Sequence, residues 1–378
     1  RALCPFCGAV SGVASAVLIG FDQRASGCRF IARFVLPAMT VSTTHQPPPV
    51  QVAIAGEALI DLIRRPDGGY LPCLGGALYN LCRALARQGV GTQYLNPLSR
   101  DRFGRELAAQ LAADGVHLAQ PDPVQQVTSL AVVNLNAHGH PDYAFYREGV
   151  ADRAVSAQGL GHACTALPAL QVVCTGALAL DARDAATYLP WLAAQRAAGH
   201  CVVVDANLRP SVMPDLAAYR SAVHAALAHA HIIKASDEDL EHLAVPGADA
   251  FVRARHLLAA NPQAHLLALT LGANGAWLLH RNGVQCFAQE AQPLPVADTV
   301  GAGDSFLAGL LTHLLRQSQP AGAGSFAQCV ETLSDTACQK ALHHALASAS
   351  LCVIEQGCVP PGWEAAVDWA QKHPAQTA

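Results

Sequence analysis

The sequence predicts an α/β protein with three layers, in which helices cover both faces of a mostly parallel central sheet and a small β-sheet forms a lid. The 378-residue chain is 52% hydrophobic and only 14% charged, so much of its length must be buried, as in a parallel sheet between two helical layers. From residue 52 onward, short apolar runs alternate with amphipathic segments, which is typical of βαβ units. One pair of strand-like runs breaks this alternation and predicts the lid.

The first part of the alternation begins with residues 52–56, a short apolar run that ends in glycine and predicts a buried strand. Residues 77–88 carry a helical pattern closed by a glycine, and residues 92–98 predict the next strand. A second glycine-closed helix is expected over residues 104–113. This order of strand, helix, strand and helix predicts neighbouring parallel strands.

The interruption consists of two strand-like runs, residues 130–136 and 143–147, joined by a short segment that contains glycine and proline. We expect the lid to comprise about residues 60–75 and 128–148. An exposed lid sheet has open edges and an apolar face to cover, which predicts a homodimer formed through the lid.

After this interruption the alternation of strands and helices resumes. Strands are predicted over residues 170–175, 201–205, 231–234 and 266–271. Helices are predicted over residues 183–197, 216–228, 248–259 and 306–316, with a final helix over residues 340–354. The helix at 306–316 presents a broad leucine stripe, so we expect it to pack deeply in the core.

The predicted α/β domain covers residues 49–372, followed by a tail at 373–378. Residues 1–48 are expected to be a disordered N-terminal extension, because they end in a proline-rich segment and the first methionine of the chain is Met39. We therefore expect Met39 to be the natural start of synthesis.

The net charge, the apolar runs and the cysteines of the chain indicate which partners and which location to expect. The formal net charge of −4 offers no basic surface for nucleic acid, and no apolar run is long enough to span a membrane. Several of the 13 cysteines lie in apolar runs, which predicts reduced thiols and a cytoplasmic protein. Cys4 and Cys7 form a CxxC pair, but no second pair follows, so we do not expect a zinc ribbon.

The strongest chemical signal is the string DTVGAGDSF, residues 298–306. Gly301, Ala302 and Gly303 precede a helix, and small residues there let backbone N–H groups approach an anion at the positive end of the helix dipole. Asp304 in the first turn is placed to accept a proton from an attacking hydroxyl beside that anion. The alternative is an aspartate that only caps the helix.

Two further strings offer groups for a polyol. GGALYN contains Gly75 and Gly76, which permit close backbone approach, and Asn80, which is both donor and acceptor. GEALID ends at Asp61, whose carboxylate can accept hydrogen bonds from two adjacent hydroxyls. Each has a plain alternative, a loop-to-helix junction for the first and a solvated turn for the second.

Arginines follow two strand patterns. The run FYREGVAD places Arg147 beside aromatic residues that can cover a sugar, and DANLR ends a predicted parallel strand with Asn207 and Arg209. Ligands of α/β proteins collect at the carboxyl ends of parallel strands, so Asn207 and Arg209 are expected to face the cleft. The alternative for both arginines is a solvent-exposed strand end.

The next two strand ends carry capping and glycine patterns. In KASDED, Ser236 is a good N-cap and Asp239 suits the first turn of a helix, which already explains the pattern. In TLGANG, Thr270, Gly272 and Gly275 form a strand-to-turn segment of a frequent kind.

Taken in order, these strings resemble the ribokinase-like (PfkB) family of carbohydrate kinases, and GEALIDLI is similar to its bacterial fructokinase branch. The resemblance covers most of the chain after residue 50. It implies a ribokinase-like fold, with Asp304 as the catalytic base and Gly301, Ala302 and Gly303 as an anion hole. It also implies a monovalent-cation site, for K⁺, near Asp298.

The resemblance assigns further roles to the other strings. The substrate-binding residues that it implies are Asp61, Gly75, Gly76, Asn80, Arg147, Arg209 and Asp304. The nucleotide-binding residues are Ser236, Asp239, Thr270, Gly272, Gly275 and Gly303. The family has Asn-x-x-Glu where this chain has Ser236 and Asp239, so the shorter Asp239 is expected to act on Mg²⁺ through water.

The function expected from this resemblance is transfer of a phosphoryl group from ATP, with Mg²⁺, to a sugar hydroxyl. Fructose is the first substrate expected, and 2-dehydro-3-deoxygluconate, ribose or a nucleoside are the alternatives. A sugar-binding regulatory protein without activity is the alternative of another class, since fold alone does not establish function. Intact glycines and an intact Asp304 favour the enzyme.

Overall fold

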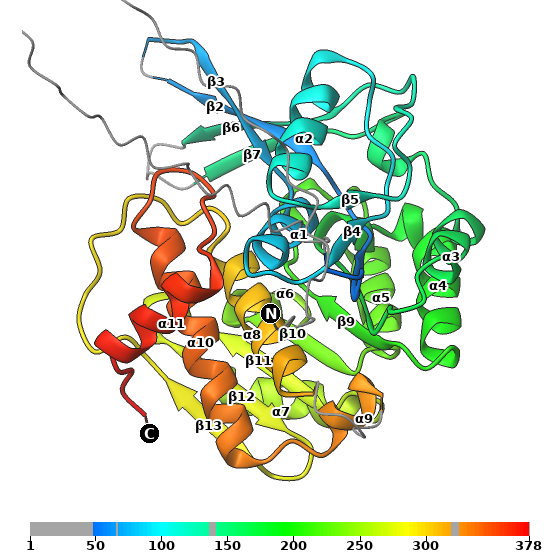
Figure 1. The fold of residues 1–378 in the computed structure, drawn as a ribbon. Helices are drawn as coiled ribbons and strands as arrows, with labels where there is room; N and C mark the ends of the chain where they lie inside the picture. Colours follow the sequence, from blue (N-terminus) through cyan, green and yellow to red (C-terminus); the bar gives the residue numbers. More distant parts are fainter. Residues whose placement is uncertain (1–47, 66, 136–140, 319–324, 378) are drawn as a thin grey trace, which may run out of the picture. The chain divides into compact units, whose positions relative to one another are not determined.

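A nine-stranded sheet forms the centre of the protein, with strand order β13-β12-β11-β10-β9-β8-β1-β4-β5 (Figure 1). In this computed structural model, residues 48–65, 67–135, 141–318 and 325–377 are described. The strands are β1 (Val52–Ile54), β4 (Thr92–Tyr94), β5 (His117–Leu118), β8 (Val172–Gly176), β9 (Cys201–Asp205), β10 (Ile232–Ser236), β11 (Leu266–Thr270), β12 (Ala276–His280) and β13 (Gln285–Ala288). Neighbouring strands from β5 to β11 pair in parallel, whereas β12 pairs with β11, and β13 with β12, in antiparallel fashion.

Helices cover both faces of this sheet. One face carries α1 (Ala77–Arg87), α2 (Arg102–Ala113), α8 (Ala302–Gln317), α9 (Phe326–Glu331) and α10 (Asp335–Val353), and α11 (Trp363–Lys372) packs on α10. The other face carries α3 (Ala157–Thr165), α4 (Ala185–Ala197), α5 (Leu216–Leu227), α6 (Asp237–His242) and α7 (Ala250–Ala260). Short 3₁₀ segments lie at Ala151–Arg153, Ala177–Leu180, Ala182–Asp184, Pro210–Val212 and Gly272–Asn274.

The side chains of β1 alternate between the two faces of the sheet, which shows why two helical layers form. Val52 and Ile54 point into the hydrophobic core shared with α1, α8 and α10, whereas Ala53 points into the core shared with α4 and α5. Successive side chains of a strand face opposite sides, so a strand that is apolar at every position must be covered twice. The predicted three-layer α/β/α fold is therefore confirmed.

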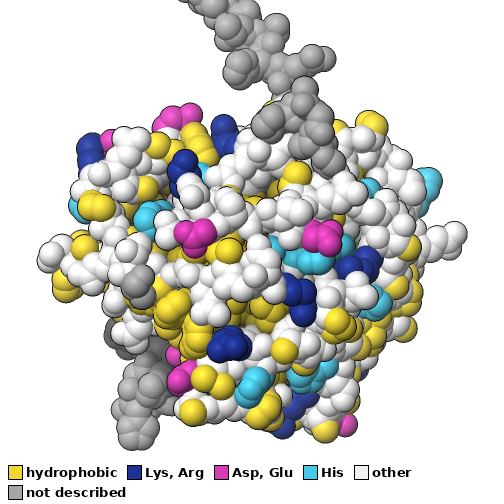
Figure 2. All heavy atoms as spheres, turned by 90° about the horizontal axis from the view of Figure 1, so that it is seen from below, with side chains coloured by type: hydrophobic (Ala, Val, Ile, Leu, Met, Phe, Trp, Pro, Cys, Tyr) yellow, Lys and Arg dark blue, Asp and Glu magenta, His cyan; other side chains and the backbone are white. Residues whose placement is uncertain are grey.

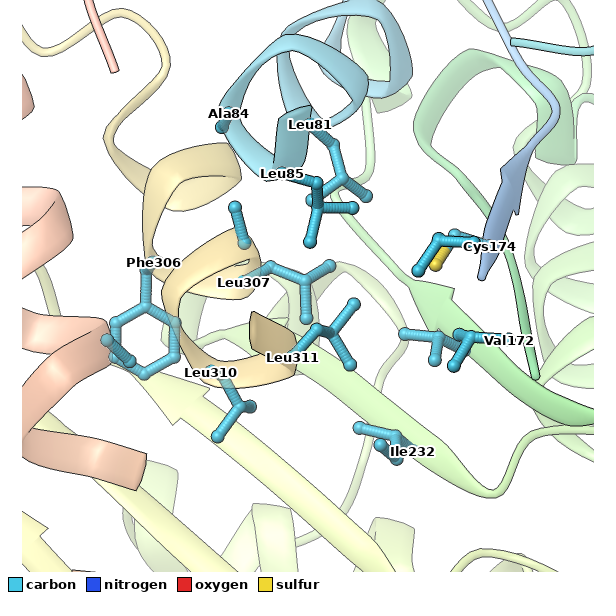
Figure 3. Packing of buried hydrophobic residues seen from close by; sticks show 14 of the residues in the cluster. Leu81, Ala84, Leu85, Val172, Cys174, Ile232, Phe306, Leu307, Leu310 and Leu311 are labelled. Carbon is cyan, nitrogen blue, oxygen red and sulfur yellow. The ribbon is translucent and has the colours of Figure 1, made fainter. Parts of the chain in front are cut away.

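Helix α8 lies at the centre of one core. Figure 3 shows Leu307 and Leu311 of α8 pointing toward Leu85 of α1 and toward strand residues such as Val172. On the side of α10, a Cβ at Gly309 would lie 2.5 Å from Ser348 Oγ, so the two helices cross closely because Gly309 has no side chain. The predicted leucine stripe is thus buried, and the helix begins four residues earlier than the sequence pattern indicates.

The lid is a separate four-stranded sheet with order β3-β2-β6-β7, drawn toward the top of Figure 1. Its strands are β2 (Leu59–Arg64), β3 (Tyr70–Gly75), β6 (Ser129–Leu135) and β7 (Pro141–Tyr146). β2 pairs with β3 and β6 with β7 in antiparallel fashion, while β2 and β6 are parallel. The predicted excursion from the βα alternation is confirmed; its connecting residues 136–140 lie outside the described part of the chain.

Several boundaries differ from the sequence-based expectation. The strand predicted over 92–98 ends at Tyr94, and the helix predicted to be the last is followed by α11. Strands β12 and β13 were not predicted, and they extend the sheet beyond β11. Short apolar runs fit strand or helix equally well, and their pairing across the sheet decides the outcome.

At the chain ends, the expectations for residues 1–47, including Met39, Cys4 and Cys7, lie outside the described residues. Figure 2 shows Lys and Arg side chains dispersed over one face of the molecule.

Candidate active site

The site is centred on the N-terminus of α8. Gly301 is the N-cap residue with a φ of 79°, and it makes no side-chain capping bond. The first helical residues are Ala302, Gly303 and Asp304. Because the first N–H groups of a helix lack intrahelical acceptors and lie at the positive end of its dipole, this turn is suited to an anion.

Close neighbours explain why glycines occupy this turn. A Cβ at Gly301 would lie 2.3 Å from Cys358 Sγ, and one at Gly303 would lie 3.0 Å from Lys234 Nζ. The positive φ of Gly301 also strains any L-residue. Lys234 therefore brings a positive charge to the same turn.

The Asp304 carboxylate is buried, with 7% of the residue exposed. Its Oδ2 atom accepts a hydrogen bond of 3.0 Å from Asn80 Nδ2, although the two residues are 224 positions apart. Burial raises the pKa of Asp304, opposed by the charge of Lys234, the Asn80 hydrogen bond and the charge of Arg209. The group is thus a carboxylate of increased basicity, surrounded by donors and cations.

Lys234 forms a buried ion pair with Asp205, with Nζ lying 3.0 Å from Oδ1 and 3.1 Å from Oδ2. Burial acts against the charge of Lys234, but the carboxylates of Asp205, Asp239 and Asp304 outweigh it and raise the pKa of the ammonium group. Lys234 and Asp205 were not predicted as site residues. The signal was present, because each is a charged residue in a strand of otherwise apolar pattern.

A second group of predicted residues lies around Gly75, at the end of β3. A Cβ at Gly75 would lie 2.3 Å from Asp61 Oδ2, so the carboxylate of Asp61 lies directly over Gly75. Burial raises the pKa of Asp61 to about 6, opposed by Arg209. The charge of Arg209 acts on both Asp61 and Asp304 and opposes the rise in the pKa of each. Asn80 Oδ1 finds no hydrogen-bond partner among the described residues.

The start of α1 is held in place by Gly76 and by Glu57, a residue that was not predicted to belong to the site. Gly76 has a φ of 111°, and a Cβ there would lie 2.6 Å from the backbone oxygen of Glu57. Glu57 Oε1 accepts a 2.9 Å hydrogen bond from the N–H of Ala77. Burial raises the pKa of Glu57 to about 7, opposed by the charge of Arg147. Glu57 follows Gly56 in the GEALID string, so its position at a strand end was the available signal.

Arg147 influences Glu57 through its charge, but its hydrogen bonds are made to other residues. It donates to the backbone oxygen of Leu178 at 3.1 Å and to Asp152 Oδ2 at 3.3 Å. It lines a cavity of about 780 Å³ beside the lid, together with Phe145 and Asp181, and neither Asp61 nor Asp304 lines that cavity. Its predicted contact with substrate stays a prediction.

A larger cavity of about 930 Å³ lies on the Lys234 side of the α8 N-terminus. All the residues predicted to bind nucleotide line it: Ser236, Asp239, Thr270, Gly272, Gly275 and Gly303. Asn207, Lys234 and Ala302 also line it, as does Leu346 of α10. A volume of this size accommodates a nucleotide-sized ligand.

Two predicted metal-linked aspartates bind backbone groups. Asp239 Oδ2 accepts from the N–H of Ser236 at 2.8 Å, and Oδ1 accepts from the N–H of Leu208 at 2.7 Å. With the Ser236 hydroxyl this forms a capping box for α6. Asp298 accepts from the N–H groups of Val300 and Gly357, both at 3.0 Å. Asp298 thereby joins the turn before α8 to the loop after α10.

The chain was compared with known proteins. Residues 51–364 match the family described as pfkB family carbohydrate kinase. A fructokinase from Rhizobium leguminosarum bv. trifolii is 32% identical over 270 residues, which cover 70% of this chain and 79% of that protein. An aminoimidazole riboside kinase from Salmonella typhimurium is 31% identical over 272 residues, covering 70% of this chain and 81% of that protein.

A solved structure of a fructokinase with bound ATP from Xylella fastidiosa has a similar fold. Its TM-score is 0.72 and its sequence identity 26%, with 85% of this chain and 98% of that chain covered. The match of sequence and fold extends over both sheets and over α8. The chain therefore belongs to the pfkB family of carbohydrate kinases and is an ATP-dependent sugar kinase.

Proposed function

We propose that this protein is a fructokinase that transfers a phosphoryl group from ATP to a hydroxyl of fructose, with Asp304 as the general base. The observation that carries the proposal is the position of Asp304 between two sets of groups. On one side it accepts a hydrogen bond from Asn80 and is influenced by the charge of Arg209, which also acts on Asp61. On the other side Gly303 and Lys234 line the cavity of about 930 Å³.

The sugar is held by the groups around Gly75 and Gly76. Asp61 accepts hydrogen bonds from sugar hydroxyls, and the Asn80 Oδ1 atom, which lacks a partner among the described residues, accepts another. Asn80 Nδ2 orients the Asp304 carboxylate. Asp304 then accepts the proton of the attacking hydroxyl, for which its raised pKa is suited. Arg147 is proposed to close the lid side of this site.

The developing negative charge on the phosphoryl group is stabilised by the start of α8. The N–H groups of Gly301 and Gly303 supply donors at the positive end of the helix dipole, and the N–H of Ala302 joins them if it exchanges its 3.3 Å hydrogen bond to the backbone oxygen of Thr299 for one to the phosphoryl group. The ammonium group of Lys234, held beside Gly303 by Asp205, adds a full positive charge. Phosphoryl transfer is accelerated mainly by such positioning and charge stabilisation.

The residues of the larger cavity fit ATP and Mg²⁺. Thr270, Gly272 and Gly275 form its turn after β11, and Ser236 and Asp239 lie at the start of α6. Mg²⁺ bound there would supply positive charge that offsets the negative charge of the phosphate groups. Since both Asp239 oxygens already accept backbone N–H groups, Asp239 would hold this ion through water. Asp298 is proposed to lie near a K⁺ site, which a comparison of rates in K⁺ and in Na⁺ tests.

A nucleoside-type substrate is the second candidate, because an aminoimidazole riboside kinase is 31% identical to this chain. The test is release of ADP over a panel of fructose, ribose, 2-dehydro-3-deoxygluconate and aminoimidazole riboside. We expect the highest kcat/KM with fructose. A higher value with another member of the panel would contradict the assignment of fructose and leave the kinase assignment intact.

The role of Asp304 is tested separately with Asp304→Asn, which keeps the size and the Asn80 neighbour. We expect kcat to fall by about 10²- to 10⁴-fold, because proton acceptance is lost. Sugar binding, measured by calorimetry, and the thermal unfolding midpoint serve as controls for folding. Unchanged kcat in a folded variant would refute the general-base role. Fructose binding without turnover by the unmodified protein would favour a regulatory protein.

A further inference from the structure

Two cysteines meet beneath the N-terminus of α8. Cys352 lies in the last turn of α10, and Cys358 lies in the loop that leads to α11. A Cβ at Gly301 would lie 2.3 Å from Cys358 Sγ and 3.6 Å from Cys352 Sγ, so both sulfurs lie against the same glycine. When protonated, the Cys352 thiol donates a hydrogen bond of 3.6 Å to the backbone oxygen of Val300.

The two sulfurs share the space beside Gly301, and each changes the pKa of the other. A hydrogen bond from Cys358 lowers the pKa of Cys352 to about 7, against the effect of burial and with help from Ser305 and the N–H of Val359. The same contact raises the pKa of Cys358, which therefore keeps its proton. A pair that shares one proton near neutral pH combines a thiolate nucleophile with an adjacent second sulfur.

Other buried cysteines of the described chain differ from this pair. Cys174 and Cys201 lie on the neighbouring strands β8 and β9, but Cys174 is opposite Val203 and Cys201 is opposite Val172. Burial raises the pKa of both thiols. Buried cysteines with raised pKa values are inert, whereas here the acidic thiol, Cys352, is fully buried but lies beside the half-buried Cys358, through which peroxide reaches the pair.

We propose that Cys352 and Cys358 form a reversible dithiol–disulfide site whose oxidation slows phosphoryl transfer. With hydrogen peroxide as oxidant, the thiolate attacks one peroxide oxygen and becomes a sulfenic acid, and the other oxygen leaves as water after protonation. The second thiol then displaces the sulfenic oxygen as water and forms the S–S bond. The two thiols together lose two hydrogens, and one peroxide becomes two waters. A dithiol reductant reverses the step by exchange.

The effect on rate follows from the position of the pair. A covalent bond draws the sulfurs closer together than a hydrogen bond does, so Cys358, Cys352 or both must move. Cys358 contacts Gly301, and the N–H of the preceding residue Gly357 holds Asp298 in the turn before α8. Movement there displaces the start of α8, three residues before Asp304. This second half of the inference rests on the proposed anion hole, whereas formation of the bond does not.

Peptide mapping tests bond formation independently of turnover. Trypsin releases residues 341–372 as one peptide, because no Lys or Arg lies between Lys340 and Lys372. Cys352 and Cys358 are its only cysteines, and Glu355 lies between them. After treatment of the full chain with peroxide, further cleavage at Glu355 should leave the two fragments linked until a reductant is added. Separate fragments before reduction would overturn the proposal.

Kinetic measurements test whether the disulfide slows phosphoryl transfer. We expect kcat of the oxidised protein to be lower by about ten- to a hundredfold, and to recover with dithiothreitol. Cys358→Ser and Cys352→Ala should keep basal kcat and resist peroxide. Cys329→Ser, which removes a half-buried thiol on α9, is the matched control and should remain sensitive. A linked peptide with unchanged kcat would overturn the regulatory role, and equal sensitivity of Cys358→Ser would assign the loss to another cysteine.

Discussion

At the scale of single residues, Asp304 and Lys234 influence each other through their charges. Burial raises the pKa of Asp304, and Lys234 is the first of the groups that oppose this rise. A general base must be ionised, so the rate should fall at low pH as Asp304 gains a proton. The acidic limb of kcat/KM is therefore expected above the pH at which an ordinary aspartate titrates.

Lys234→Met should move this acidic limb to higher pH and lower kcat, because Asp304 loses its main cationic neighbour. The measurement is a pH profile of kcat/KM, with thermal unfolding as the check on folding. Asp205→Asn is the matched control, since it removes the partner of Lys234 but keeps the lysine charge, and its limb should not move to higher pH. If the acidic limb of kcat/KM stayed at the same pH in Lys234→Met, the proposed effect of the Lys234 charge on the pKa of Asp304 would be contradicted.

Asp61 gives a second prediction at this scale. Its pKa is about 6, so the carboxylate gains a proton as pH falls through 6 and loses acceptor capacity for sugar hydroxyls. We expect the KM for the sugar to rise below pH 6 while the KM for ATP changes little. Asp61→Asn should show a high sugar KM that no longer varies in this range. A pH-independent KM in the unmodified protein would argue against sugar contact by Asp61.

At the scale of elements, the glycine turn before α8 combines strain and crowding. Gly301→Ala places a Cβ 2.3 Å from Cys358 Sγ at a φ of 79°. We expect the free energy of unfolding to fall by about 1–3 kcal/mol, together with kcat. Gly161→Ala in α3 is the matched control, because its Cβ meets nothing within 4 Å and alanine favours a helix by about 0.5–1 kcal/mol. Denaturant unfolding measures the free energy of unfolding of both variants, and equal values for Gly301→Ala and Gly161→Ala would contradict the prediction.

The elements around the site also show what local patterns can predict. The glycine strings, Ser236 and Thr270 could be predicted from the sequence because each pattern lies within one loop or helix start. Glu57, Lys234 and Asp205 were missed, since their importance comes from partners on other elements. Arg147 was predicted from the FYR pattern, but its buried ion pair with Asp152 is not visible in that pattern.

At the scale of the whole molecule, the lid sheet predicts association. Tyr70 and Leu71 on β3 are 47% and 40% exposed, and Tyr146 on β7 is 62% exposed. Exposed aromatic residues on open sheet edges favour pairing with a second copy. Light scattering is expected to give a homodimer, and Tyr146→Glu should weaken it. Leu216→Glu, a 36%-exposed position on α5, is the control that should leave the dimer intact, and a monomeric unmodified chain would contradict the prediction.

The sequence by itself determined the alternation of strands and helices, the excursion that forms the lid and the glycine turn with its aspartate. These features depend on periodicity and on backbone freedom within short segments. Only the tertiary structure decided that Asn80 meets Asp304 across 224 positions, that β12 and β13 extend the sheet, and that Cys352 and Cys358 meet under Gly301. Such contacts arise from packing between distant elements, which no local pattern encodes.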